Sequence, residues 1–494
     1  MAQNDFDPRH LETLDRDLGR FSFLESAASL AGKPLVGPGI GLVFIMLAAL
    51  ASALFLGQGS NNLLVVVAAG FGAYMALNIG ANDVANNMGP AVGANALTMG
   101  GAIAIAAIFE SAGALIAGGD VVSTISKGII APDSMADEQI FIWAMMAALL
   151  ASALWINLAT WIGAPVSTTH SVVGGVMGAG VVAAGFGAVS WGKMGAIAAS
   201  WVISPALGAL IAAGFLWLIK ARIIYRDDKI VAARVWVPVL VGIMSGTFAA
   251  YLALKGLKHL IRISFGHALL IGLALGVLTW LIMIPVVRRQ SQGLENRNKS
   301  LKVLFGIPLV VSAALLSFAH GANDVANAVG PLAAIVAASQ HGAFASSVSI
   351  PAWVMLIGAF GISFGLFLFG PKLIRMVGSQ ITKLNPMRAY CVALSAAITV
   401  IVASWLGLPV SSTHIAVGAV FGVGFFREWD SERRLRKAAM AIPDRPAVSP
   451  EERRRRKLVR RSHLLTIAAA WIVTVPAAAI LSALIFLIIG QLLS

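Results

Sequence analysis

The chain has 494 residues, of which 58% are hydrophobic and only 12% are charged. Soluble domains carry about a quarter of their residues as Asp, Glu, Lys or Arg, so this composition excludes an array of soluble domains and predicts an all-α integral membrane protein. A single cysteine, Cys391, excludes a disulfide framework, and no Cys/His cluster has the spacing of a zinc site. The formal net charge of +14 is interpreted below from where the charges lie.

The chain begins with a polar stretch, residues 1–38, that carries both signs of charge and lacks the features of a signal peptide. We predict that it is a cytoplasmic N-terminal extension. A membrane span needs about 20 mostly apolar residues, and thirteen segments come close, although 413–426 is short. The predicted spans are 39–57, 61–79, 98–118, 140–163, 171–189, 194–219, 235–254, 267–287, 303–319, 350–370, 388–408, 413–426 and 463–490.

The basic residues fix the predicted orientation. With the N-terminus inside, 31 of the 36 Lys and Arg residues fall in inside segments, as the positive-inside rule requires. We therefore expect a multi-pass protein of the cell membrane with a cytoplasmic N-terminus and an outside C-terminus. The five basic residues expected outside are Lys127, Lys193, Lys255, Lys258 and Arg262.

A dense basic run, 453–457, lies in the predicted cytoplasmic loop 427–462. We interpret it as a solvated loop that sets the topology, with contact to anionic membrane lipids as the alternative. Nucleic acid is not an expected partner, because no aromatic-rich soluble module accompanies the charge.

Two motifs occur twice in the same order. Residues 80–90 read GANDVANNMGP and residues 321–331 read GANDVANAVGP, identical at nine of eleven positions. Residues 163–170 read GAPVSTTH and residues 407–414 read GLPVSSTH. The copies are offset by 241 and 244 residues, which chance does not plausibly produce and which indicates an internal duplication.

The predicted topology makes the two halves inverted, because the span before the first motif runs inward and the span before the second runs outward. Inverted repeats recur in secondary transporters. We predict an inverted-repeat secondary transporter with broken or re-entrant helices and about 12–13 transmembrane spans. Its expected parts are an extra N-terminal span at 39–57, transport repeat 1 at 61–219, a two-span connector at 220–302 and transport repeat 2 at 303–490.

Three acids lie within or beside apolar stretches: Asp83, Glu110 and Asp324. An intramembrane carboxylate costs at least about 2.5–3.5 kcal/mol, so its default interpretation is functional. Asp83 and Asp324 occupy equivalent positions of the repeat, which packing alone does not require. The second half has no acid at the position that matches Glu110. The alternative to a functional role is that Glu110 is a structural residue whose charge is satisfied by neighbouring amides.

Amides surround the two repeated acids, and glycine and proline flank them. We expect the glycines and prolines to break both helices and expose backbone carbonyls, which lipid tolerates only inside protein or beside a cavity. Carboxylate, amide and carbonyl oxygens together suit a hard cation such as Na⁺. The candidate Na⁺ ligands are Asn82, Asp83, Asn86, Asn323, Asp324 and Asn327.

The second motif predicts an anion site. Pro165 and Pro409 end one helix, and the Ser/Thr run that follows has the residues of a helix N-cap. Free N–H groups and the positive dipole end at a helix start favour anions, although ordinary capping is the alternative. The candidate phosphate ligands are Ser167, Thr168, Thr169, Ser411, Ser412 and Thr413, with Asp83 and Asp324 beside them.

Histidine closes each copy of the second motif. His170 and His414 are more simply packing residues, with a proton-relay role as the alternative, since His titrates near neutrality. His320 has no counterpart in the first copy, where Ile79 stands, and no role is assigned to it.

At these motifs the chain resembles the inorganic phosphate transporter (PiT) family, over both halves, roughly 61–430. The resemblance implies secondary uptake of phosphate coupled to Na⁺ or H⁺, with some bacterial members carrying sulfate or metal–phosphate complexes. It implies that Asp83 and Asp324 are the essential acids and that the adjoining Asn, Ser and Thr residues are ligands. Asn before Asp is similar to sodium-coupled members, whereas many proton-coupled bacterial members have His there.

The resemblance also concerns Glu110, which is similar to an acid of eukaryotic members and is a candidate coupling acid. Those members tend to have a second acid before the second Ser/Thr motif, but Val392 to Ser395 contains none. This departure leaves the coupling stoichiometry open.

The expected function is symport of inorganic phosphate driven by a cation gradient, Na⁺ favoured over H⁺, with alternate exposure of the site by rocking of one repeat against the other. No cofactor is expected, and homo-oligomerisation is left open. A sulfate or metal–phosphate permease on the same scaffold and a passive anion channel are the alternatives. An intramembrane Ser/His hydrolase is disfavoured, because an enzyme has no need for an inverted second copy and no G-x-S-x-G turn is present.

Overall fold

The computed structural model describes residues 35–56, 62–130, 134–135, 137–162, 166–256, 263–341, 350–380, 384–441 and 461–493. This part of the chain is almost entirely helical, and its one β-bridge joins Ile130 and Val189. Most of the predicted extension 1–38 and the run 453–457 lie outside the described residues.

Within the described residues, eleven helical stretches are long and apolar enough to cross a membrane. The first is Leu35–Ala53. The elements that follow are α2 (Asn62–Asn82), α3 (Val84–Gly93), α4 (Met99–Ala117), α5 (Gly119–Lys127), α6 (Glu138–Ile162), α7 (Thr168–Ala184), η2 (Phe186–Ala188), α8 (Trp191–Ile219), η3 (Lys220–Ile224), α9 (Lys229–Lys255), α10 (Phe265–Gln290), α11 (Leu301–Leu304), α12 (Gly306–His341), α13 (Ala352–Gln380), α14 (Pro386–Trp405), α15 (Ser412–Ala441) and α17 (Arg461–Leu493).

The predicted spans all coincide with helices, and the lengths differ most clearly for three of them. The span predicted at 303–319 is the first part of α12, which continues to His341. The span predicted at 171–189 is the shorter apolar helix α7. The short span predicted at 413–426 is the first part of α15, which continues to Ala441 because the charged residues after Phe426 still form good helix. The prediction of an all-α membrane protein is confirmed.

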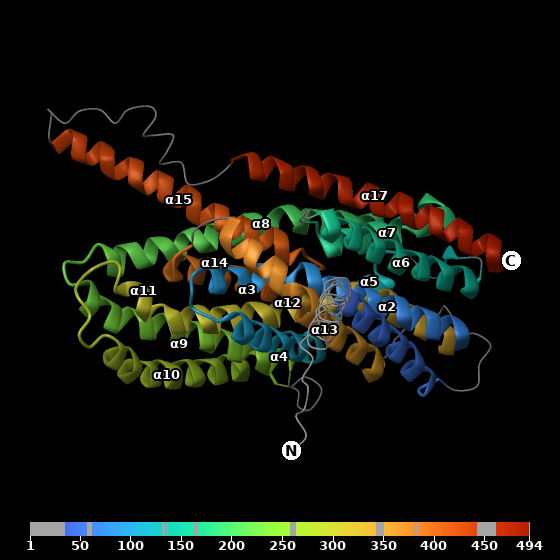
Figure 1. The fold of residues 1–494 in the computed structure, drawn as a ribbon, viewed down its shortest axis with the longest axis horizontal. Coiled ribbons are helices and arrows are strands. Elements are labelled where there is room, and N and C mark those ends of the chain that lie inside the picture. Colours follow the sequence, from blue (N-terminus) through green and yellow to red (C-terminus); the bar gives the residue numbers. More distant parts are fainter. Residues whose placement is uncertain are drawn as a thin grey trace, which may run out of the picture.

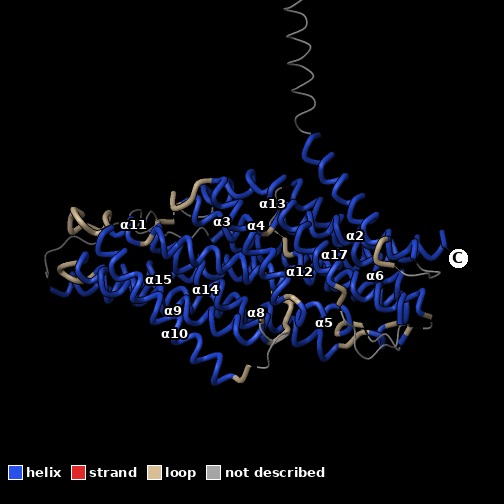
Figure 2. Tube along the Cα trace, turned by 90° about the horizontal axis from the view of Figure 1, so that it is seen from below, coloured by secondary structure: helices blue, strands red, loops and turns tan. Residues whose placement is uncertain are grey.

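The helices run roughly along the long axis of the molecule (Figure 1). The turn between α8 and α9 and the short helix α11 lie at one end, and the C-terminus lies at the other (Figures 1 and 2). Helices α9 and α10, the predicted connector, pack closely on each other. The remaining helices form the bundle that holds the repeated motifs.

Helix contacts in the bundle come in matched pairs under the offset between the two halves. Helix α2 packs on α13 while α4 packs on α12, and α7 packs on α17 while α15 packs on α8. Likewise α6 contacts α17, and α14 contacts α8. These reciprocal pairings are consistent with the predicted inverted repeat.

Glycines make the matched crossings possible. A Cβ at Gly80 would overlap the carbonyl oxygen of Ile362 on α13, and one at Gly321 would overlap that of Glu110 on α4. Small residues of this kind let membrane helices approach closely. Glycines also allow α7 to pack closely on α17 and α15 to pack closely on α8. Equivalent glycines make those contacts: Gly174 and Gly178 on α7, and Gly418 and Gly422 on α15.

The prediction that glycine and proline break the motif helices is wrong for both copies, because Gly80 lies inside α2 and Gly89 and Pro90 lie inside α3. The first helix is interrupted at Asp83, between α2 and α3, whereas α12 runs without a break through Asp324 and Pro331. The motif glycine serves close packing rather than a turn. A proline inside a membrane helix is tolerated where surrounding protein satisfies the freed carbonyl.

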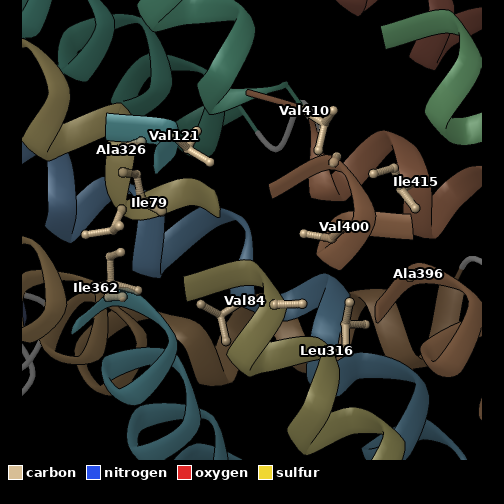
Figure 3. Close-up of a cluster of buried hydrophobic side chains, with 14 of the residues drawn as sticks. Ile79, Val84, Val121, Leu316, Ala326, Ile362, Ala396, Val400, Val410 and Ile415 are labelled. Atoms are coloured by element: carbon tan, nitrogen blue, oxygen red, sulfur yellow. The ribbon is translucent and has the colours of Figure 1, made fainter. Parts of the chain in front are cut away.

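An apolar shell surrounds the repeated acids. Ile79, directly before the first motif, and Val84, directly after Asp83, lie among side chains contributed by α12, α13 and α14 (Figure 3). Both are fully buried. Such surroundings lower the local dielectric, so every polar contact inside them counts for more than it would in water.

Candidate functional site

Each Ser/Thr run begins a helix, as its N-cap pattern predicts. Helix α7 begins at Thr168, and the Ser167 hydroxyl caps it by accepting a hydrogen bond of 3.2 Å from the His170 backbone N–H. Helix α15 begins at Ser412, and Ser411 accepts the equivalent bond from His414 at 3.3 Å. The two hydroxyls therefore fix the helix starts and are not aimed at the acids.

Asp83 receives hydroxyls from both helix starts. Thr168 of α7 donates to one carboxylate oxygen at 2.7 Å, and Thr413 of α15 donates to the other at 3.1 Å. The side chain sits at the break between α2 and α3 and is 1% exposed. One carboxylate thus joins four helices and both halves of the chain.

Asp324 is the centre of the second set of contacts. Ser412 donates to its Oδ2 at 2.9 Å, in the same relation that Thr168 has to Asp83. The His320 Nε2 lies 2.8 Å from the same oxygen, one helical turn earlier on α12. Ligand atoms of Asp83, His320 and Asp324 all lie within 4.8 Å of one another. The structure therefore brings the two repeated acids together, with an imidazole beside them.

The motif amides repeat two further hydrogen bonds. Asn86 donates to the Thr413 hydroxyl at 2.9 Å, and Asn327 donates to the Thr169 hydroxyl at 3.1 Å. These pairs cross from each acidic motif to a Ser/Thr run. The second pair of bonds holds Asn82 to Thr160 at 2.7 Å and Asn323 to Ser404 at 3.1 Å.

The side-chain oxygens of the predicted Na⁺ ligands differ in whether they already accept a hydrogen bond. The Asn323 oxygen already accepts a hydrogen bond of 3.2 Å from the Val410 N–H. The Asn327 Oδ1 and the Asp324 Oδ1 are buried, and no donor among the described residues reaches either. Buried acceptors without a donor fit a bound cation or a ligand that donates protons. Asn327 and Asp324 are thus predicted ligands that each have a buried oxygen without a hydrogen-bond donor among the described residues.

His320 and Glu110 form a second part of the site, and this pairing was not predicted from the sequence. The Glu110 Oε1 lies 3.3 Å from His320 Nδ1 and accepts a hydrogen bond of 3.0 Å from the Asn87 amide. Glu110, His320 and Asp324 therefore form a buried chain of three titratable groups. The position of His320 four residues before Asp324, on the same helix face, is the sequence signal that could have found it.

His170 and His414 contact each other rather than the acids. Their rings lie 4.4 Å apart edge to face, and Trp201 lies 3.8 Å from the His170 ring. Both histidines are buried. This arrangement favours the packing interpretation over a proton relay.

The hydroxyl of Thr169 joins the two Ser/Thr segments, because it donates a hydrogen bond of 3.0 Å to the Val410 carbonyl. Segment 166–167 and segment 408–411 are not helical, and most of their residues are buried within protein. Non-helical backbone of this kind occurs at membrane depth only where protein or a water-filled cavity surrounds it. The motifs of both halves thus converge on one polar centre.

Comparison with known proteins decides the family. The family described as "Phosphate transporter family" matches residues 79–482. The chain belongs to the phosphate transporter family. It is 48% identical to a "Putative phosphate permease" of Helicobacter pylori, over 94% of this chain and 97% of the relative. It is 37% identical to "Inorganic phosphate transporter 2-1, chloroplastic" of Arabidopsis thaliana, over 89% of this chain and 75% of the relative.

A solved structure described as "The sodium-dependent phosphate transporter" shares the fold, with a TM-score of 0.78 and 35% identity. The match covers 87% of this chain and 99% of the solved one. Membership of a transporter family confirms that the protein is a membrane transporter and not an enzyme. The Ser/His hydrolase alternative is thereby excluded, and Ser167 and Ser411 are explained by their capping bonds.

Proposed function

We propose that this member of the phosphate transporter family is a secondary active symporter that couples inorganic phosphate uptake to Na⁺. The observation that carries the proposal is the pair of hydrogen bonds that Asp83 accepts from Thr168 and Thr413. They place a carboxylate, which attracts cations, directly against two helix starts, which attract anions. Sites for opposite charges in contact give coupled binding.

Phosphate binds, in this proposal, between the starts of α7 and α15. The hydroxyls of Thr168, Ser412 and Thr413 already point toward the acids and can turn to the anion. Backbone N–H groups of the first helical turns supply further donors. No lysine or arginine is needed, which keeps the anion exchangeable.

Sodium binds beside the phosphate on the oxygens of Asp83, Asp324 and Asn327. The buried, donor-free oxygens of Asp324 and Asn327 support this assignment, as does the oxygen preference of hard cations. A bound Na⁺ offsets the charge of phosphate, so each ligand raises the affinity for the other by the same factor. Symport requires such coupled binding, together with a change of exposure that occurs only when both ligands or neither are bound.

Both acids are 1% exposed, so this conformation closes the site to either side. Transport requires opening to each side in turn, as in other inverted-repeat carriers. A passive anion channel, the less favoured alternative, needs no such closed state.

Phosphate is preferred over sulfate because of the carboxylates. Phosphate keeps a proton at neutral pH that it can donate to Asp83 or Asp324, whereas sulfate would place an acceptor against an acceptor. Such a mismatch costs about 1–3 kcal/mol. Arsenate, which also keeps a proton, should inhibit phosphate uptake strongly and sulfate only weakly. Equal inhibition by the two anions favours the sulfate permease instead.

A second candidate for the driving ion is H⁺. The buried chain of Glu110, His320 and Asp324 favours it, because an imidazole between two carboxylates can hold and pass a proton. Uptake driven by a proton gradient in the absence of Na⁺ would select this candidate.

The decisive experiment is uptake of radiolabelled phosphate into liposomes under separately imposed Na⁺ and H⁺ gradients. We expect concentrative uptake with the Na⁺ gradient and its loss in Asp83→Asn and Asp324→Asn. Asp120→Asn is the matched control, because Asp120 pairs with Lys255 outside the site. Concentrative uptake by the double mutant Asp83→Asn/Asp324→Asn would remove the carboxylates from the mechanism.

A further inference from the structure

A cavity lined by several cationic residues lies apart from the central site, at the end of the molecule where η3 and α11 meet α14 and α15. Its volume is about 420 Å³. None of the ten described residues that line it is acidic. We call it the basic pocket, after its five cationic side chains: Lys220, Lys299, Lys302, Arg388 and Arg427.

Within the described residues, the acids that interact with these five cations are Asp430 and Glu428. Lys220 pairs with Asp430 at 2.7 Å. Arg388 and Arg427 are half-buried and line the same cavity. Arg427 is attracted by Glu428, its neighbour in the chain, and no described residue accepts a hydrogen bond from the side chain of Arg388. Two half-buried guanidiniums held together in this way are stabilised by an anion between them.

The basic pocket lies beside a second cavity that extends in the direction of the central site. A neighbouring cavity of about 670 Å³ shares Lys302, Asn385 and Arg388 with it and reaches the chain segment 93–96. That segment begins at Gly93, the last residue of α3, which is the ten-residue helix that starts directly after Asp83. Ten helical residues span about 15 Å. The length of α3 therefore separates the proposed phosphate site from the neighbouring cavity, which shares three lining residues with the basic pocket.

We propose that the basic pocket binds a phosphate group, at the end of the molecule that the charge distribution predicts to be cytoplasmic. Guanidiniums bind phosphate oxygens with two parallel hydrogen bonds, and ammonium groups add charge around them. The phosphate group comes from inorganic phosphate leaving or entering the central site, or from the headgroup of an anionic lipid. The first source rests on the proposed function, and the second does not.

The first arm of the test measures equilibrium binding of radiolabelled phosphate to the purified full-length protein in neutral detergent. The variant Asp83→Asn removes the central site, so the binding that remains reports on the basic pocket. In that background Arg388→Gln/Arg427→Gln should weaken phosphate binding about tenfold or more. Arg288→Gln/Arg289→Gln is the control, because it removes two arginines from the last turn of α10 without touching the pocket lining.

The second arm measures the thermal stability of the same proteins in vesicles of phosphatidylcholine with and without phosphatidylglycerol. If lipid is the source, phosphatidylglycerol raises the melting temperature of the parent and of the α10 control but not of Arg388→Gln/Arg427→Gln. Arg388→Lys/Arg427→Lys keeps the charge and should keep part of the effect in whichever arm responds, which separates binding from misfolding.

The outcomes separate the two proposals. A change confined to the first arm identifies inorganic phosphate, and a change confined to the second identifies a lipid headgroup. Identical behaviour of Arg388→Gln/Arg427→Gln and the α10 control in both arms overturns the basic pocket as a phosphate-group site. Phosphate binding that is insensitive to Asp83→Asn in otherwise native protein instead counts against the central site, whatever the arginine variants do.

Discussion

The Thr413 hydroxyl donates a hydrogen bond of 3.1 Å to Asp83, 330 residues away in the chain. Thr413 belongs to the second copy of one motif and Asp83 to the first copy of the other. The contact therefore exists only if both halves of the duplicated chain build a single site. Loss of this one hydroxyl should consequently impair phosphate transport.

Replacing Thr413 with Val keeps the shape of the side chain and removes the hydroxyl. A hydrogen bond to a charged group contributes about 1.5–3 kcal/mol, so we expect the KM for phosphate to rise about tenfold or more, while Thr413→Ser stays near the native value. Uptake kinetics in liposomes provide the measurement. The control is Thr399→Val, because the hydroxyl of Thr399 bonds only the Ser395 carbonyl of its own helix. Equal kinetics for Thr413→Val and Thr399→Val would contradict the assigned role.

His320 should be energetically coupled to Glu110. Removing one partner of a buried ion pair costs about 3–5 kcal/mol, because the other charge is left without compensation. We expect His320→Ala to lower the melting temperature strongly and Glu110→Gln to restore part of that loss in the double mutant. Thermal unfolding of the four proteins gives the coupling energy, which should exceed about 1 kcal/mol. Additive effects would show that the 3.3 Å contact carries no energy.

Gly80 and Gly321 should not tolerate alanine. The added methyl group would overlap the carbonyl oxygen of Ile362 in one case and of Glu110 in the other. Overpacking typically costs about 1–3 kcal/mol, and a backbone atom cannot move aside as a flexible side chain can. Gly100→Ala is the control, since nothing lies within 4 Å of the methyl position there. Expression and melting temperature should fall for the first two variants only, and equal stability of all three would refute the close crossings.

Asp430 of α15 should stabilise the contact of this helix with η3, which follows α8, and this contribution should depend on pH. Burial raises the pKa of this carboxyl, but hydrogen bonds from Lys220 and Tyr225 outweigh burial and hold the pKa below its ordinary value. The pKa of Tyr225 is raised to about 12 by burial and by its bond to Asp430, so the phenol remains a donor at neutral pH. A depressed carboxyl pKa contributes stability above the unfolded value of about 4 and loses it as the pH falls through the folded value.

The test compares Asp430→Asn with the native protein in thermal unfolding at pH 7 and near pH 3. The variant should be less stable by about 1–2 kcal/mol at pH 7, and the difference should shrink at low pH. Asp228→Asn, at the cap of α9, is a matched control for loss of charge at the same end. A difference between Asp430→Asn and native protein that is independent of pH would contradict the ion-pair explanation.

The sequence predicted the helices, the duplication and the residues of the central site because each leaves a local signal. Apolar length marks the spans, and the Ser167 and Ser411 caps follow from residue type alone. The position of His320 could not be interpreted from the repeat, because this residue occurs in one copy only and breaks the symmetry. Its role depends on Glu110, which α4 brings to it from 210 positions earlier in the chain.

The continuity of α12 could not be predicted either. Gly321 and Pro331 are helix breakers by propensity, but a tight crossing with α4 stabilises the helical form of the first and surrounding protein accommodates the second. The basic pocket had no local signal at all. Its cationic residues come from separate parts of the chain, so only the tertiary structure brings Arg388 near Arg427.

The close packing at the glycines of α7 and α15 joins helices that come from different halves of the chain. Helix α17, from the end of the chain, is fastened to α6 and α7, while α8 is fastened to α14 and α15. Each of these two helix groups therefore combines early and late parts of the sequence, and neither group coincides with one half of the duplication. In the proposed transport cycle, the helix groups that would move to expose Asp83 are accordingly not the two halves of the sequence.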